Sequence, residues 1–362
     1  MVMSRPASRF LVAALLSLVA CDGAIDDEDR RPREGEGEGE DEVDDGPKLP
    51  VNASTWTYTD VDGAVCGNGG PVGVATNGGT SSRLVIYLEG GGACWNALTC
   101  NNDFADNVKT GIAASTKQVI TSNSRGIFDR RAGNNPFATD SFAYVPYCTG
   151  DLHAGTNAST SHGVQHVGGN NFALMLPMIL RSFPDVTEVL LAGTSAGGYG
   201  ALFNAEKVKA AIDDDDVEFS VLLDSAIPLP PFAGGDAFLS EQLTSWAPSL
   251  CATCTNLQTI YEDARLGLPG TRIGMTMTTA DGTLRQFFTT NGVPISAAAW
   301  ESAVTAFVDS HVDDDFATFI QRSQKHVFVY DANLEATVID GVSLADFYAG
   351  VVGDSAFVSA SE

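Results

Sequence analysis

Short apolar runs recur along the chain, and longer mixed segments separate them. The runs predict six strands, at Leu84–Leu88, Phe142–Pro146, Val189–Ala192, Phe219–Leu223, Arg272–Thr278 and Phe316–Ile320. Several runs show little alternation between apolar and polar residues, which is typical of parallel strands covered on both faces. Segments of helical character lie between them, near Phe172–Phe183, Tyr199–Ile212, Leu239–Trp246 and Ala297–Ser310. This order predicts the α/β class, with a doubly wound, mostly parallel sheet and helices on both faces.

The chain begins with a segment that is typical of exported proteins. Arg5 and Arg9 come before an apolar stretch, Phe10–Leu16, that is too short to span a bilayer. The sequence Leu18-Val-Ala-Cys21 follows and resembles the bacterial lipobox, in which the cysteine is acylated. We therefore expect residues 1–21 to be a lipoprotein-type signal peptide, with Cys21 anchoring the protein to the bacterial cell envelope. The alternative is an ordinary signal peptide with a chance cysteine, and a secreted protein.

Charge separates a tether from the rest of the chain. Residues 22–50 hold 13 acidic and four basic residues, among them Glu34-Gly-Glu-Gly-Glu-Gly-Glu40. They contain almost no large apolar side chains, so we expect a disordered tether. Residues 1–21 carry +2 and the tether −9, so residues 51–362 carry −19 of the total net charge of −26. This segment is long enough for a single domain, and its acidity disfavours nucleic acid and other polyanions as partners.

Seven cysteines are consistent with an oxidising compartment. With Cys21 assigned to the lipid, six remain: Cys66, Cys94, Cys100, Cys148, Cys251 and Cys254. An even number in an exported chain indicates disulfide bonds, and spacing alone leaves about fifteen possible pairings. The sequence Cys251-Ala-Thr-Cys254 also leaves zinc binding open, although no second pair of ligands follows at zinc-finger spacing.

The most informative motif is Gly193-Thr-Ser-Ala-Gly197. An apolar run precedes it and a helical segment follows. This context predicts a nucleophile elbow, a tight strand-to-helix turn that exposes the hydroxyl of Ser195. The alternative is a glycine-rich turn between a buried strand and its crossover helix.

A second glycine-rich turn follows the strand at Leu84–Leu88, in the sequence Glu89-Gly-Gly-Gly92. Turns of this kind supply backbone N–H groups to an oxyanion hole, because glycine lets the backbone approach the developing negative charge. We expect Gly91, Gly92 and Ala196 to be the donors. The alternative is a flexible turn; a phosphate-binding loop is disfavoured because no Lys-Ser or Lys-Thr follows the glycines.

A nucleophilic serine needs a base and an acid, which follow it in the order Ser, acid, His in this class of site. Of the five histidines, only His311 and His326 lie beyond Ser195 and an acid that follows it. We favour His326, which lies in a loop after the last predicted strand. For the acid we favour Asp281, at the end of the strand Arg272–Thr278, over Asp224, at the end of the preceding strand.

Three further histidines, His153, His162 and His166, lie together in one predicted loop. His162 and His166 are four residues apart and could share a helix face as metal ligands, but no carboxylate lies at ligand spacing. We expect neither a metal nor a cofactor.

Taken together, these residues resemble the pectin acetylesterase family, which includes the Notum-type carboxylesterases. The matching pieces are Leu88-Glu-Gly-Gly-Gly92 with Cys94 and Cys100, Tyr147-Cys-Thr-Gly-Asp-Leu-His153, and Gly193-Thr-Ser-Ala-Gly-Gly198. The resemblance covers about residues 55–350. It implies an α/β-hydrolase fold, Ser195 as nucleophile, and Asp281 and His326 as acid and base. It also implies the disulfides Cys94–Cys100 and Cys66–Cys148, which leaves Cys251 and Cys254 as the third pair.

The resemblance implies a serine carboxylesterase that removes an acetyl or other small acyl group, on a glycan or a small molecule. Amidase or thioesterase action would use the same residues. The alternative from another class is a non-catalytic envelope lipoprotein that uses the fold as a binding surface. Acetylated pectin is the substrate that the family name suggests, but polygalacturonate is a polyanion, and a domain charge of −19 should slow their encounter. We expect a monomer.

Overall fold

The computed structural model describes residues 46–102, 104–228, 235–311 and 313–362, with the side chains of 235–238 left aside. The expected signal peptide, Cys21 and all but the last five residues of the tether lie outside these ranges. Within the described ranges, no helix has both the length and the apolar character needed to cross a membrane.

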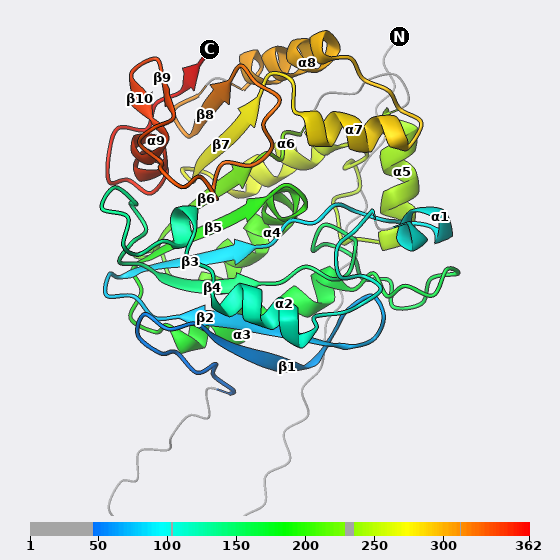
Figure 1. Ribbon diagram of the computed structural model, residues 1–362, viewed down its shortest axis with the longest axis horizontal. Helices are drawn as coiled ribbons and strands as arrows, with labels where there is room; N and C mark the ends of the chain where they lie inside the picture. Colours follow the sequence, from blue (N-terminus) through cyan, green and yellow to red (C-terminus); the bar gives the residue numbers. More distant parts are fainter. Residues whose placement is uncertain (1–45, 103, 229–234, 312) are drawn as a thin grey trace, which may run out of the picture. The chain divides into compact units, whose positions relative to one another are not determined.

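A nine-stranded sheet organises the described residues, stacked in Figure 1 from β1 to β8 and β11. Its spatial order is β1 (Thr57–Val65), β2 (Pro71–Asn77), β4 (Ser141–Val145), β3 (Arg83–Leu88), β5 (Glu188–Thr194), β6 (Glu218–Asp224), β7 (Arg272–Thr278), β8 (Phe316–Gln321) and β11 (Ala360–Ser361). In this spatial order, the seven strands that begin with β4 and end with β11 are parallel to one another. Strands β1 and β2 are antiparallel to their neighbours. The chain passes from β3 to β4 on one side and then to β5 on the other. The strand order therefore reverses at β3 and β5, where open α/β sheets bind their ligands.

Helices connect the strands and cover the sheet. They are α1 (Ala97–Asn101), α2 (Ala114–Thr121), α3 (Gly168–Ser182), α4 (Ala196–Ile212), α5 (Gly235–Trp246), α6 (Leu257–Gly267), α7 (Gly282–Thr290), α8 (Ala297–Asp309) and α9 (Leu344–Val351). A short 3₁₀ helix, η1 (Gly126–Phe128), and a small hairpin, β9 (Val338–Ile339) and β10 (Val342–Ser343), complete the fold.

Two apolar clusters explain why the strands are continuously apolar. Leu84, Ile86 and Leu88 of β3 belong to the cluster that includes residues of α3, α4, α6 and α8. Val85 and Tyr87 of the same strand belong to the opposite cluster, which includes residues of α2 and α9. Because alternate residues of a strand point to opposite faces, a strand covered on both faces is apolar at every position.

All six predicted strands are present, with ends that differ from the prediction by at most two residues. The prediction missed the β1–β2 hairpin, because only two of the nine β1 residues are buried and the strand mixes polar with apolar residues. It also placed the start of α3 too late, at Phe172 instead of Gly168. Glycine and asparagine are poor helix formers. Here the Asp151 carboxylate accepts a hydrogen bond from the Gly168 N–H at 2.7 Å, which stabilises the first turn.

Three disulfides are present in the described chain: Cys66–Cys148, Cys94–Cys100 and Cys251–Cys254. The expectation of disulfide bonding is confirmed, and these bonds support export to an oxidising compartment. The bond between Cys251 and Cys254 removes the thiolates that a zinc site would need.

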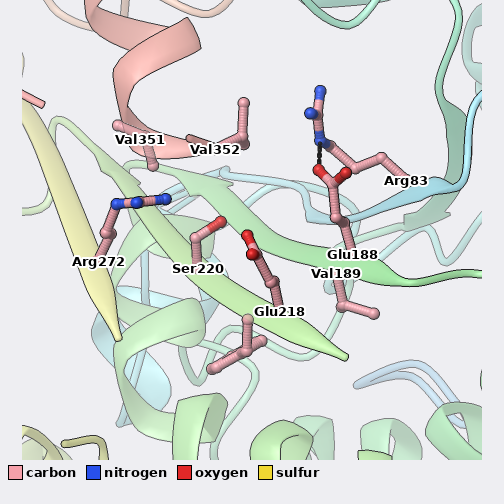
Figure 2. A pocket seen from close by; sticks show the side chains of 9 residues that line it. Arg83, Glu188, Val189, Glu218, Ser220, Arg272, Val351 and Val352 are labelled. Carbon is pink, nitrogen blue, oxygen red and sulfur yellow. Dashed lines mark hydrogen bonds and ion pairs between the residues drawn. The ribbon is translucent and has the colours of Figure 1, made fainter. Parts of the chain in front are cut away.

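The amino ends of the strands carry an ionic network. Arg83 of β3 is nearly buried and pairs with Asp140 at 3.2 Å, Glu188 at 2.7 Å and Asp354 at 2.9 Å. Figure 2 shows Arg83, Glu188 and Arg272 around a cavity of only 20 Å³. This volume has room for little more than one water molecule. We therefore assign this end of the sheet to stability, and the candidate functional site lies at the opposite end, where the parallel strands have their carboxyl ends.

Candidate active site

Ser195 occupies a sharp turn between β5 and α4, at the point where the strand order reverses. Its backbone has φ +54° and ψ −120°, a conformation that residues other than glycine rarely adopt. The Ser195 N–H donates to the Asp224 carbonyl at 2.7 Å. A Cβ atom on Gly197 would lie 2.0 Å from the Leu88 carbonyl oxygen, so only glycine fits there. These features are those of a nucleophile elbow.

The glycine turn after β3 lies directly beside the elbow. A Cβ atom on Gly90 would lie 2.4 Å from the Thr194 carbonyl oxygen and 3.3 Å from Ser195 Cβ. Gly91 and Gly92 have φ values of +148° and +75° and line the same cavity as Ser195. Ala196 begins α4, where backbone N–H groups have no partner within the helix. The three expected oxyanion donors thus lie on segments that meet at Ser195.

His326 and Asp281 are in contact, although 45 residues separate them. His326 Nδ1 lies 2.7 Å from Asp281 Oδ2, and Asp281 is almost fully buried. The other oxygen, Oδ1, accepts from the Leu284 N–H at 2.8 Å and so caps the N-terminus of α7. With its Nδ1 proton donated to Asp281, His326 would keep Nε2 free to accept a proton. His326 and Ser195 line one cavity of 490 Å³.

Asp224, the alternative acid, has a different environment. Its carboxylate is completely buried and accepts hydrogen bonds from the Thr276 hydroxyl at 2.6 Å and the Phe328 and Val329 N–H groups at 2.8 and 3.0 Å. Burial raises its pKa, and these hydrogen bonds oppose that shift. Asp224 therefore fixes the segment just after His326, and Asp281 is the acid that contacts the imidazole.

The other histidines have separate partners. His162 Nε2 and His166 Nε2 are 3.0 Å apart, in a loop and not on a shared helix face. His166 lies close to the sulfur atoms of Cys94 and Cys100, but that pair is a disulfide and offers no thiolate. His311 Nδ1 lies 2.7 Å from the Phe307 carbonyl oxygen and lines a different cavity from Ser195.

Glu89 and His153 support the glycine turn, a role that was not predicted for either residue. The Glu89 carboxylate accepts from the Tyr147 N–H at 2.9 Å. The Glu89 carbonyl oxygen lies 2.8 Å from Nε2 of the buried His153, which can donate to it. Both residues stand within the matched motifs, but the sequence does not show that the two motifs meet. Together they fix the residue that leads into Gly90.

Burial raises the pKa of Glu89 from 4.5 to about 7, with a smaller contribution from Asp106 and opposition from hydrogen bonds of Tyr147 and Tyr144. The folded protein therefore binds this proton more tightly than the unfolded chain does. Its contribution to the free energy of unfolding is fully present below about pH 4.5 and is lost as the pH rises through about 7.

We expect Glu89→Gln to remove this pH dependence, because glutamine resembles the protonated acid at every pH. Relative to the wild type, the variant should gain about 2 kcal/mol between about pH 4.5 and pH 8.5, less than the full pKa difference because Glu89 partly faces the open cavity. Denaturant unfolding of both proteins at the two pH values measures this gain. A stability difference that is the same at both would contradict it.

The cavity around Ser195 is partly apolar and partly acidic. Phe104 and the α7 residues Thr283, Gln286, Phe287 and Thr290 form one side of it. The described residues that line it include two carboxyl groups, those of Glu89 and Asp106, and no lysine or arginine. Such a wall favours neutral over anionic ligands.

Comparison with known proteins agrees with this geometry. The sequence model of the pectinacetylesterase family matches residues 48–227, which include β1 to β6 and Ser195. The chain belongs to this family. The prediction of the family is therefore confirmed, and the family's name and those of its Notum relatives describe carboxylic ester hydrolases.

Individual proteins of known name are also similar in sequence to this chain. The palmitoleoyl-protein carboxylesterase notum2 of Xenopus laevis is 33% identical over 150 residues, which are 40% of this chain and 30% of that protein. The human palmitoleoyl-protein carboxylesterase NOTUM is 26% identical over 159 residues, 41% of this chain and 30% of that protein. The chain thus spans about a third of the length of these curated relatives.

A solved structure has a similar fold over most of this chain. The Wnt deacylase Notum from Drosophila has a TM-score of 0.65 and 16% sequence identity, and the match covers 80% of this chain and 91% of that one. At this identity the match concerns the fold alone. The expected α/β-hydrolase architecture is confirmed.

Proposed function

We propose that the protein is a serine carboxylesterase, with Ser195 as nucleophile, His326 as base and Asp281 as the acid that orients the imidazole. The observation that carries the proposal is the contact between Asp281 and His326 beside the cavity that Ser195 lines. In this proposal Asp281 stabilises the imidazolium without taking its proton. The N–H groups of Gly91, Gly92 and Ala196 stabilise the oxyanion.

The reaction proceeds in two steps. Ser195 Oγ attacks the acyl carbonyl carbon while His326 Nε2 takes the hydroxyl proton. The ester C–O bond then breaks, and His326 returns the proton to the leaving alcohol. Water adds to the acyl-enzyme, gives a proton to His326, and releases the carboxylic acid as Ser195 regains its proton.

For the substrate we propose an acetyl or other small acyl ester of a neutral glycan. The wall formed by Glu89 and Asp106 disfavours a polyuronate, the more so as Glu89 ionises above about pH 7, and so does the net charge of −19 on residues 51–362. We further propose that the chain is monomeric and anchored to the cell envelope through a lipid on Cys21.

Labelling with a fluorophosphonate probe tests the catalytic proposal. We expect the probe to form one adduct, which peptide mass spectrometry maps to Ser195, and the protein to hydrolyse short-chain p-nitrophenyl esters. An adduct elsewhere would overturn the assignment of the nucleophile. A folded protein with neither label nor turnover would instead favour the non-catalytic alternative.

A further inference from the structure

A second cavity, of 590 Å³, lies near the active site, and we call it the hydroxyl-lined groove. The first turn of α1, the loop 157–162 and one face of α5 surround it, and α1 and α5 lie side by side in Figure 1. Most of its lining side chains are small and carry hydroxyl or amide groups: Asn96, Asn157, Ser159, Thr160, Ser161, Ser240, Thr244 and Ser245.

The groove adjoins the catalytic cavity through two aromatic rings. Trp95 lines the groove and is almost fully buried, so it forms part of the floor. The ring of Trp95 lies 6.0 Å from the ring of Phe287, centroid to centroid, and Phe287 lines the cavity of Ser195. The two rings thus form a wall between the cavities, and a chain-like substrate with its ester at Ser195 would cross this wall to reach the groove.

Hydrogen bonds between its walls hold the groove in place. Asn96 Nδ2 donates to Glu241 Oε1 at 3.0 Å and so joins the start of α1 to α5. Asn157 Nδ2 donates to the Ser245 carbonyl at 2.8 Å, and Trp246 Nε1 donates to the Cys94 carbonyl at 2.7 Å. Because the walls are already joined, a ligand would bind with little loss of conformational entropy.

The chemistry of the lining points to an uncharged, hydroxyl-rich ligand. The described residues that line the groove include no lysine or arginine, and one carboxylate, that of the exposed Glu241. Burial lowers the pKa of His162, with His166 adding to the effect, so His162 is neutral near pH 7. The Ser245 hydroxyl is buried beneath this lining, so the hydroxyls that a ligand can reach on α5 are those of the exposed Ser240 and Thr244.

We propose that the hydroxyl-lined groove is a subsite that binds the neutral sugar chain carrying the ester. The proposal builds on the esterase function above and adds the class of polymer and the surface that holds it. Hydroxyl and amide side chains of the groove bind the sugar hydroxyls. The acyl group occupies the separate cavity of Ser195, which has a volume of 490 Å³.

Filling the groove tests the proposal. Thr244→Trp places a large side chain on its α5 wall, at an exposed position where the Thr244 hydroxyl donates only to the Ser240 carbonyl four residues earlier. Thr305→Trp is the matched control, because Thr305 is also exposed and donates to the Glu301 carbonyl four residues earlier, on α8. Ser240→Trp repeats the test on the same wall in case Thr244→Trp folds poorly.

Binding is measured without turnover, on the Ser195→Ala protein, by affinity electrophoresis in xylan, galactomannan, dextran and polygalacturonate. We expect at least one neutral glycan to bind, and Thr244→Trp to raise its dissociation constant by about tenfold or more, whereas Thr305→Trp leaves it unchanged. Polygalacturonate should bind more weakly. Equal binding with and without Thr244→Trp, no binding to any neutral glycan, or tighter binding to polygalacturonate would each overturn the proposal.

Kinetics separates this proposal from the proposed function. With Ser195 intact, Thr244→Trp should raise KM for the acetylated form of the bound glycan and leave p-nitrophenyl acetate hydrolysis within about twofold of the wild type. If the glycan binds in the groove but no ester is hydrolysed, the esterase proposal fails and the subsite stands. If esters are hydrolysed with the same KM after Thr244→Trp, the subsite fails and the esterase stands.

Discussion

Replacing Ser195 with alanine is expected to lower kcat for a short-chain ester by about 10⁴- to 10⁶-fold, because no covalent acyl-enzyme can then form. The remaining rate would come from the oxyanion donors and substrate binding alone. KM should change little, since the missing hydroxyl contributes mainly to the transition state. Steady-state kinetics of p-nitrophenyl acetate hydrolysis measures both parameters.

The control is Ser302→Ala, which removes a hydroxyl from the exposed side of α8. This variant should keep the activity of the wild type. If Ser195→Ala retained more than a few per cent of kcat while Ser302→Ala behaved as expected, the activity would belong to another group in the protein.

The fold could be predicted where burial on both faces dominates the sequence. The runs that form β3 and β5 are apolar at nearly every position because each strand packs against both clusters. The β1–β2 hairpin could not be found in this way. Seven of the nine β1 residues are only half-buried or exposed, so the strand lacks a continuous apolar signal.

The site divides in a similar way. Ser195 could be found because its turn needs glycines at fixed positions on either side, which leaves a local motif. Glu89 and His153 are 64 residues apart and contact each other, and neither lies in a local sequence pattern that predicts this contact. Such supporting residues depend on which loops the sheet brings together, and a single sequence does not contain that information.

Asp224 and Asp281 illustrate the limit most clearly. Both follow parallel strands at the same edge of the sheet, and both lie between Ser195 and His326 in the sequence. Strand β7 ends four residues before the start of α7, so Asp281 stands at a helix N-terminus with one oxygen directed to the cap and the other to His326. Asp224 instead ends its strand inside the protein, where only backbone N–H groups and hydroxyls surround it.

This difference leads to opposite expectations for the two asparagine variants. Asp281→Asn should lower kcat by about 10⁴-fold, because an amide N–H facing His326 Nδ1 favours the wrong imidazole tautomer. Its stability should stay close to that of the wild type, since asparagine also caps helices well. Asp224→Asn should lower the free energy of unfolding by about 2 to 3 kcal/mol, because an amide N–H would then face donors.

Kinetics and denaturant unfolding of both variants distinguish the two roles. Asp281→Asn should unfold at the same denaturant concentration as the wild type while nearly inactive, and Asp224→Asn should unfold earlier while its folded fraction keeps much of its activity. The reverse result, a stable but inactive Asp224→Asn beside an active Asp281→Asn, would transfer the acid's role to Asp224. In that case the contact between Asp281 and His326 would serve only to attach the His326 loop to α7.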